Sequence, residues 1–313
     1  MKLIDLSENP LPPGGEAVRV GLGSGLSLRV GVWAPPAGMP CRGTVAILPG
    51  RSEFVEKYAE VVSELLARQF AVAVLDWRGQ GGSSRLLRDP RRGHVGRFAD
   101  YAADLDAMLL QVLVRLPPPR FAVAHSMGGT VALMRAARGG QGFHRIVLSA
   151  PMLEIGGLRW PGGARLLAAA MAGVGGGGVL IPGGSRRTPL GLPFEGNLLT
   201  SDRKRYAAFG ALARAAPELT IGAPTIGWVH AAFGAMAALG APGALDRAAV
   251  PVLAIGCGRD RVVDTATTER VVARMKLGRT IVVTGALHEI MMERDALRSQ
   301  FWAAFDRFVP GSG

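Results

Sequence analysis

Short runs of apolar residues alternate along most of this chain with longer segments in which apolar residues recur every three or four positions. The short runs are typical of buried strands, and the longer segments are typical of amphipathic helices that cover them. The predicted strands span residues 44–48, 70–75, 121–124, 146–148, 250–255 and 280–283, and the predicted helices span residues 54–68, 98–116, 127–137, 265–275 and 294–308. Because the strands are apolar on both sides, we predict an α/β fold with a mostly parallel sheet and helices on both faces.

Two segments depart from this alternation. Residues 17–22 and 26–33 alternate apolar and polar positions around a Gly-Ser-Gly turn, which predicts an antiparallel hairpin at the edge of the sheet. Residues 152–247 are rich in Gly, Ala and Pro and show helical patches without a clear strand. We therefore predict a core made of residues 1–151 and 248–313, interrupted by an inserted helical lid.

The junction between one predicted strand and the helix after it carries a serine, in the sequence Ala124-His125-Ser126-Met127-Gly128. A serine at a sharp strand-to-helix turn has its hydroxyl raised above the edge of the sheet, where it can act as a nucleophile. Such a turn needs small residues two positions before and after the serine. Gly128 meets this need, and Ala124 adds one methyl group where glycine is usual. We predict that Ser126 is the nucleophile and that the amide of Met127, at the helix N-terminus, stabilises an oxyanion.

A second oxyanion donor is expected from the loop that follows residues 44–48. This loop reads Pro49-Gly50-Arg51, and Gly50 allows a close turn there. We assign the second donor to the amide of Arg51. The alternative is that Pro49 and Gly50 form only a tight turn.

The serine needs a base, because a free hydroxyl is a weak nucleophile at neutral pH. His288 lies just past the last predicted strand, where a loop can bring it over the sheet, whereas the side chain of His125 is expected to point away from Ser126. Asp260 follows another strand by a short loop and is predicted to orient His288. Asp264 is the rival carboxylate, but its place before a predicted helix is typical of a cap. The order serine, aspartate, histidine matches this triad in the α/β-hydrolase fold.

The composition indicates a globular chain, since 49% of the residues are hydrophobic and 19% are charged. The formal charge of +12 has two interpretations. It could attract an anionic membrane surface, or it could reflect an arginine-rich coding bias spread over solvated faces. The densest basic group lies within residues 85–97 and has no nucleic-acid-binding motif beside it, so we predict no nucleic-acid partner.

The cysteines and the apolar stretches bear on location. Cys41 and Cys257 provide neither a disulfide framework nor a zinc site, and Cys257 ends an apolar run as a core residue would. The first residues lack the apolar core of a signal peptide, which predicts a cytoplasmic location, with peripheral contact to the inner membrane left open. Residues 166–184 and 222–245 are uncharged but interrupted by Gly or Pro, so we predict that neither stretch spans a membrane.

Four motifs together resemble one family. They lie at residues 48–58 (LPGRSEFVEKY), 76–83 (DWRGQGGS), 125–129 (HSMGG) and 256–263 (GCGRDRVV). The sequence resembles the α/β hydrolases of the lysophospholipase and monoacylglycerol lipase group. It is more similar to the bacterial lysophospholipase-like branch, because Pro49 stands where the animal lipases carry histidine. The resemblance implies a carboxylic ester hydrolase that often acts on lipids with one acyl chain and needs no metal or organic cofactor.

These observations predict a lysophospholipase or monoacylglycerol lipase-like serine hydrolase whose substrate is a lipid or small ester. The lid would line the acyl chain through apolar residues, unless these only pack the lid: Leu166, Leu167, Met171, Trp228, Phe233 and Met236. A thioesterase, an acyltransferase and a small-ester esterase stay open, because the same triad serves all of them. An aspartate-nucleophile reaction is disfavoured by Ser126. A non-catalytic protein that binds lipid surfaces is the alternative outside the enzymes.

Overall fold

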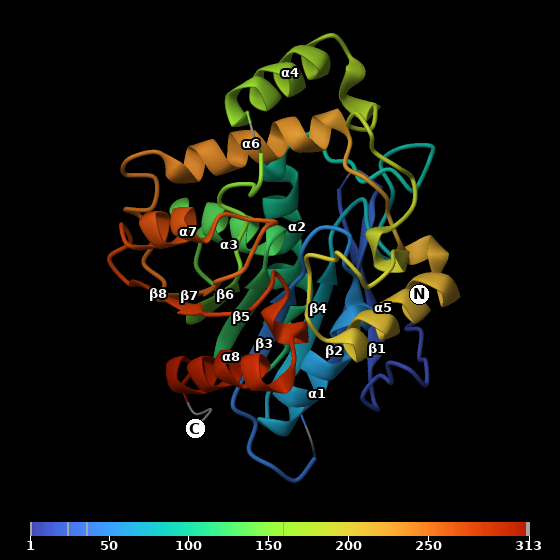
Figure 1. Cartoon of the computed structure of the whole chain (residues 1–313). Coiled ribbons are helices and arrows are strands. Elements are labelled where there is room, and N and C mark those ends of the chain that lie inside the picture. The colour runs from blue at the N-terminus through green and yellow to red at the C-terminus, as the bar shows by residue number, and fades with distance from the viewer. Residues whose placement is uncertain (1, 24, 36, 159, 311–313) are drawn as a thin grey trace.

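Eight strands form a single sheet in the computed structural model, which describes residues 2–23, 25–35, 37–158 and 160–310 (Figure 1). In chain order the strands are β1 Glu16–Gly21, β2 Ser27–Trp33, β3 Thr44–Leu48, β4 Ala71–Asp76, β5 Arg120–His125, β6 Arg145–Ser149, β7 Val252–Cys257 and β8 Gly278–Val283. Their order across the sheet is β1-β2-β4-β3-β5-β6-β7-β8.

The strand directions follow the sequence pattern. Strands β3 to β8 run parallel, whereas β1 pairs antiparallel with β2, and β2 pairs antiparallel with β4. Every residue of β3, β4 and β7 is buried, as their continuous apolar runs predict. The predicted hairpin and the predicted parallel strands are therefore confirmed.

Helices cover both faces of this sheet. They are α1 Ala59–Ala67, α2 Phe98–Gln111, α3 Met127–Ala137, α7 Thr265–Val272 and α8 Asp295–Phe308. Helix α3 matches its predicted bounds. Two predicted helices are only partly α-helical: residues 54–68 begin with the 3₁₀ turn η1 (Val55–Tyr58), and residues 98–116 end in the 3₁₀ turn η2 (Leu113–Arg115).

The direction of the crossovers determines which helix covers which face. The chain moves from β3 through α1 to β4 in one direction across the sheet, and from β4 through α2 to β5 in the other. Because crossovers between parallel strands are right-handed, α1 and α2 lie on opposite faces. Helices α3 and α7 connect strands in the same direction as α2 and share its face. Helix α8 packs beside α1 through the ion pairs Arg68–Asp306 and Arg298–Glu64.

The chain leaves the sheet between β6 and β7. The segment between them, predicted as an inserted lid over residues 152–247, contains α4 Pro161–Gly173, α5 Arg203–Ala215 and α6 Ile226–Gly240, with the 3₁₀ turns η3 Gly176–Gly178, η4 Pro189–Gly191 and η5 Pro217–Leu219. Its described residues contribute no strand to the sheet. Helices α4 and α6 pack on each other and lie across the upper end of the sheet in Figure 1, with α5 to one side. No helix in the described part of the chain is long and apolar enough to cross a membrane.

Candidate active site

The predicted nucleophile lies at a strained turn between β5 and α3. Ser126 has φ 48° and ψ −116°, a conformation that is costly for a residue with a side chain and persists only where its surroundings enforce it. Close packing provides that enforcement, because a Cβ on Gly128 would overlap the carbonyl oxygen of Leu48. Only glycine therefore lets α3 approach the end of β3 this closely. Ala124 is fully buried, so its extra methyl group is accommodated.

The three residues predicted as a triad form a continuous chain of contacts. His288 Nε2 lies 3.1 Å from Ser126 Oγ, and His288 Nδ1 lies 2.8 Å from Asp260 Oδ2. The other oxygen of Asp260 accepts hydrogen bonds from the amides of Val262 and Val263, at 2.8 and 3.1 Å. Burial opposes ionisation of Asp260, but the hydrogen bonds from His288 and the two amides lower its pKa below the usual value. The carboxylate is therefore charged and held toward the imidazole.

The rival carboxylate, Asp264, has a different contact. It accepts a hydrogen bond from the amide of Thr267 at 2.6 Å and caps the N-terminus of α7. This is the capping role that the sequence predicts for it.

His125 packs beside His288. The ring centroids of His125 and His288 lie 4.8 Å apart, and His125 Nδ1 lies 3.1 Å from the carbonyl oxygen of Ser149. Burial lowers the pKa of His125 to about 4 despite the nearby carboxylate of Glu53. His125 is therefore neutral at physiological pH and can donate its Nδ1–H to Ser149.

The loop after β3 is held by side chains on both sides. The carboxylate of Glu53 accepts a hydrogen bond from the amide of Gly50. Gln80 Nε2 donates to the carbonyl oxygens of Gly50 and Glu53, at 2.8 and 2.9 Å, and Gln80 Oε1 accepts from the amide of Ser52 at 3.3 Å. The loop is thus fixed immediately before and after Arg51.

Two amides in this region are available to an oxyanion. Among the described residues, no protein group accepts a hydrogen bond from the amide of Arg51 or from the amide of Met127 at the start of α3. Arg51 lines the same cavity as Ser126, and Met127 directly follows the serine. Free amides beside a nucleophile are the usual donors of an oxyanion hole.

The motif at residues 76–83 explains how Gln80 reaches this loop. Asp76 ends β4, and its carboxylate accepts hydrogen bonds from Arg29 Nε at 2.6 Å, from the amide of Gly82 at 2.7 Å and from the amide of Val55 at 2.9 Å. These bonds tie β2, η1 and the loop after β4 together. The motif therefore holds the loop after β3 in position, and its own residues do not react.

Ser126 and His288 open into a cavity of about 500 Å³. Its apolar lining includes Ile155, Leu190, Leu192, Leu198, Leu199 and Trp228, most of them from irregular parts of the inserted segment. A mainly apolar cavity with a few polar groups at one end suits an apolar ligand whose reactive group is held at that end.

Comparisons with known proteins now identify the family. The family described as serine aminopeptidase, S33 (Hydrolase_4) matches residues 39–295. The chain belongs to this family of α/β hydrolases. The hydrolase is 37% identical to "Lysophospholipase L2" of Escherichia coli strain K12 over 266 residues, which cover 82% of this chain and 76% of that protein. It is 26% identical to "Probable lysophospholipase L2" of Haemophilus influenzae, over 86% of this chain and 84% of that protein.

Solved structures agree on the fold. A monoglyceride lipase of Saccharomyces cerevisiae matches 96% of this chain and 98% of its own with a TM-score of 0.75, at 18% identity. The predicted α/β-hydrolase fold and the predicted resemblance to the lysophospholipase and monoacylglycerol lipase group are confirmed.

The prediction for the acyl-chain lining needs correction. Of the six residues proposed, only Trp228 lines the cavity of the hydrolase. Phe233 and Met236 are buried in the hydrophobic core, and Leu166 and Leu167 are exposed on α4. Met171, also on α4, does not line the cavity either. The apolar residues that recur with helical periodicity in this segment either pack in the hydrophobic core or face solvent. The cavity is instead lined mainly by residues in turns, which have no periodicity.

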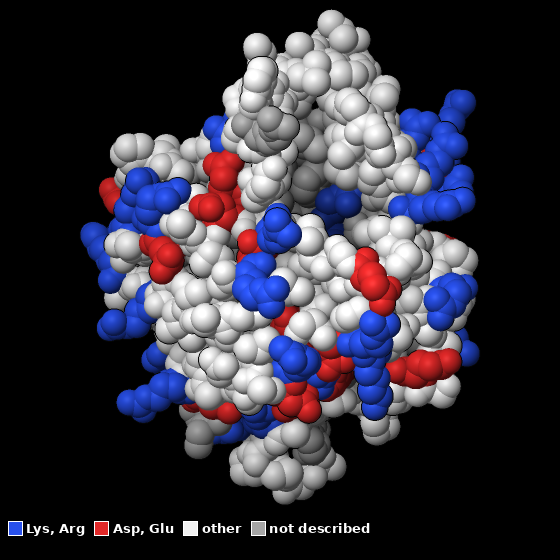
Figure 2. Space-filling model, in the orientation of Figure 1, with Lys and Arg blue, Asp and Glu red and all other residues white. Residues whose placement is uncertain are grey.

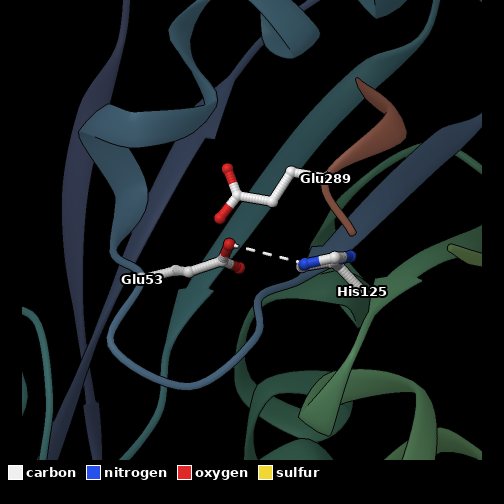
Figure 3. Close-up of side chains that lie close together, drawn as sticks. All are labelled: Glu53, His125 and Glu289. Carbon is white, nitrogen blue, oxygen red and sulfur yellow. Dashed lines mark ion pairs between the residues drawn. The ribbon is translucent and has the colours of Figure 1, made fainter. Parts of the chain in front are cut away.

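Sequence reasoning missed a buried charged cluster beside the triad. Lys57 Nζ lies 2.7 Å from Glu53 Oε1 and 2.6 Å from Glu289 Oε1, and all three side chains are buried. Figure 3 shows the carboxylates of Glu53 and Glu289 turned toward each other, with the ring of His125 beside Glu53. His125 Nε2 lies 3.6 Å from Glu53 Oε1. The available signals were weak: Glu53 and Lys57 are four residues apart, and Glu289 directly follows His288.

The charges of this cluster depend on Lys57. Burial opposes ionisation of Glu53, but Lys57 and His125 lower its pKa to about 2. For Glu289 burial prevails and raises the pKa. The ligand atoms of Glu53, His125 and Glu289 lie close enough to hold a metal ion. The ammonium of Lys57 already bridges the two carboxylates, so this arrangement has an explanation without an ion.

Cys257 is buried at the end of β7, and burial raises the pKa of its thiol well above the usual value. A thiol that stays protonated is a poor nucleophile. Cys257 is therefore a core residue, as predicted.

Proposed function

We propose that the protein is a carboxylic ester hydrolase that removes the acyl chain of lysophospholipids through Ser126, His288 and Asp260. The observation that carries this proposal is the chain of hydrogen bonds from Asp260 through His288 to Ser126 at one end of a mainly apolar cavity. The two relatives named lysophospholipase L2 support the substrate class.

The proposed reaction passes through an acyl-enzyme. His288 Nε2 takes the proton of Ser126 Oγ as this oxygen attacks the ester carbonyl carbon, and the amides of Arg51 and Met127 stabilise the oxyanion. His288 then gives the proton to the leaving glycerol oxygen as the ester bond breaks. In the second half, His288 takes a proton from water as the water oxygen attacks the acyl carbon. The bond between the acyl carbon and Ser126 Oγ then breaks, His288 returns the proton to Ser126 Oγ, and the fatty acid leaves.

The cavity favours a single acyl chain over a peptide. Its volume is that of a site for one small ligand. An aminopeptidase needs a free carboxylate to receive the ammonium group of its substrate. The carboxylates that line this cavity, Glu53 and Glu289, both contact Lys57, which already supplies a positive charge.

The substrate class is tested by fatty-acid release from lysophosphatidylcholine. Matched assays use a monoacylglycerol and an acyl thioester of the same chain length, a diacyl phospholipid and an aminoacyl p-nitroanilide. We expect the lysophospholipid to be cleaved fastest, since it has one chain and a carboxylic ester. Labelling by a fluorophosphonate probe without lysophospholipid cleavage would retain the serine hydrolase and reject this substrate class.

We further propose that residues 152–247 act as a lid that contacts a lipid surface. Large apolar side chains are exposed on and beside α4: Trp160 is 80% exposed, Leu166 72% and Val174 86%. The only charged residue described in α4, Arg165, pairs with Glu154. Figure 2 shows the described residues of this upper part of the molecule as an uncharged surface, whereas acidic and basic side chains are interspersed below it. An apolar surface of this kind marks an interaction site.

This arrangement also bears on location. The scattered charge in Figure 2 favours an apolar lipid contact over a purely electrostatic one. Cys41 and Cys257 are both free thiols, which is typical of a reducing compartment. We propose that the protein acts in the cytoplasm, at the periphery of a membrane.

Leu166→Ser is expected to weaken binding to phosphatidylcholine vesicles about tenfold, because it removes an apolar side chain from the lipid contact. The measurement is co-sedimentation with vesicles. Leu110→Ser is the matched control, since Leu110 is similarly exposed, at 74%, but lies on α2, which packs on the sheet and does not belong to the proposed lid. Binding that disappears in about 1 M salt, where screening reaches ~3 Å, would contradict the apolar contact.

A further inference from the structure

Arg51 lines the cavity beside Ser126, and its guanidinium has no acidic partner among the described residues. Its Nη1 donates to Ser52 Oγ at 2.9 Å, its Nη2 donates to the carbonyl oxygen of Gly222 at 2.5 Å, and its Cζ lies 5.3 Å from the ring of Trp228. Its Nε is buried and has no hydrogen-bond partner. In the described part of the chain, no carboxylate forms an ion pair with it. Arg51 therefore carries, at the edge of the cavity, a positive charge that the described residues leave without a counter-ion.

Two other buried cations, unlike Arg51, have acidic partners. Arg29 contacts the carboxylates of Glu56 and Asp76, and Lys57 contacts those of Glu53 and Glu289. A buried charge is normally paired, because its transfer from water is costly. Burial lowers the pKa of Arg51 to about 10, so the side chain stays charged at neutral pH. An anion supplied by a ligand would complete its contacts.

The position of Arg51 relates this charge to the reaction. Its amide is the proposed oxyanion donor, so the backbone of the residue lies at the ester carbonyl. Its guanidinium lies at the far end of the side chain, beside Ser52 and Trp228, which also line the cavity. In a lysophospholipid one glycerol unit separates the ester carbonyl from the phosphate. An arginine side chain has a similar length, and its planar fork suits phosphate oxygens.

We propose that the guanidinium of Arg51 binds the phosphate of a single-chain phosphodiester whose ester lies at Ser126. This inference rests on the proposed function and assigns the head-group contact of that same site. Arg51 then determines the preference for lysophospholipids over monoacylglycerols, which have the same ester and chain but no phosphate.

The test compares Arg51→Met with Arg85→Met. Arg85 is also partly buried and also lacks an ion pair in the described part of the chain, but it bonds to the carbonyl oxygen of Glu218 and lies outside the cavity. For each variant, kcat/KM is measured on lysophosphatidylcholine and on the monoacylglycerol of the same chain length. We expect Arg51→Met to lower the ratio of the two values about 10- to 100-fold. Arg85→Met should keep the wild-type ratio, and Arg51→Lys should restore part of it.

An equal loss of kcat/KM on both substrates, or no loss on either, would overturn the proposal. The first result would mean that the side chain only supports the loop that carries the oxyanion amide. The second would mean that the phosphate does not contact Arg51.

An inhibition assay gives an answer even if lysophospholipids are not substrates. Dodecylphosphocholine and 1-O-dodecylglycerol are compared as inhibitors of p-nitrophenyl butyrate hydrolysis. We expect Arg51→Met to raise Ki for the phosphodiester about 10- to 100-fold relative to Ki for the ether. If wild type cleaves no lysophosphatidylcholine, the proposed function fails. The phosphate site still stands if this shift in Ki is found, and falls if it is not. Equally strong inhibition by inorganic phosphate would assign the charge to free phosphate and overturn the head-group contact.

Discussion

Ser126→Ala is expected to lower kcat/KM for ester hydrolysis by about 10⁴- to 10⁶-fold. The hydroxyl is the atom that bonds to the acyl carbon, and the alanine side chain leaves His288 with no oxygen to deprotonate. Fatty-acid release measures hydrolysis of the ester, and fluorophosphonate labelling measures bond formation at the serine hydroxyl. The variant should lose both. Thermal unfolding should occur near the wild-type temperature. Near wild-type hydrolysis by a folded Ser126→Ala variant would contradict the proposed mechanism.

The same assay tests which carboxylate orients His288. It compares substitutions of two aspartates, Asp260 and Asp264, that are four residues apart. Asp260→Asn should reduce kcat about 10⁴-fold, because an amide no longer favours the tautomer in which His288 Nε2 can accept a proton. Asp264→Ala should leave catalysis nearly intact and cost about 1 kcal/mol of stability through loss of the cap of α7. The opposite pattern would assign the orienting role to Asp264.

The parts of the structure that the sequence predicts well are those governed by local patterns. Strand β3 and helix α3 have the predicted bounds, because continuous apolar runs and helical periodicity are read within a few neighbouring residues. Ser126 is found for the same reason, since a turn between strand and helix restricts the residue types on either side. Asp260 and His288 are placed by the rule that parallel strands end at one edge of a sheet, where loops meet.

The parts that could not be predicted depend on long-range contacts. Lys57 and Glu289 are 232 residues apart, and charged residues in a sequence are assumed to face water. The prediction of the cavity lining fails for another reason. Leu190 lies in a 3₁₀ turn and Leu198 in a loop, so neither belongs to a periodic pattern, whereas α4 displays a pattern and places Leu166 on the surface.

The cluster around Lys57 gives the largest expected effect on stability. Lys57→Met should reduce the free energy of unfolding by about 3–5 kcal/mol, because it leaves Glu53 and Glu289 buried together without a positive charge. Their repulsion would also act on the loop that Glu53 holds through the amide of Gly50. Denaturant unfolding at neutral pH measures the loss as a shift of the midpoint.

The pH dependence separates this electrostatic cause from a loss of packing. Without the cation, the folded-state pKa of Glu53 should rise above the unfolded value of about 4.3, and that of Glu289, which burial already raises, should rise further. A group with a raised folded-state pKa binds protons more readily when folded, so stability falls as pH rises between the unfolded and the folded pKa. The deficit of Lys57→Met should therefore be largest at neutral pH and shrink toward pH ~4, where both carboxyls are protonated in the variant.

A second substitution provides the matched control. Glu289→Gln in the Lys57→Met background should recover part of the lost stability, because it removes one of the two unpaired charges while keeping the shape of the side chain. The same change in the wild-type background removes a partner of Lys57 and should destabilise. A deficit of only about 1 kcal/mol in Lys57→Met, independent of pH, would mean that water screens the cluster as it screens surface ion pairs. In that case the charges of Lys57, Glu53 and Glu289 would not hold in place the loop after β3, which carries the proposed oxyanion donor.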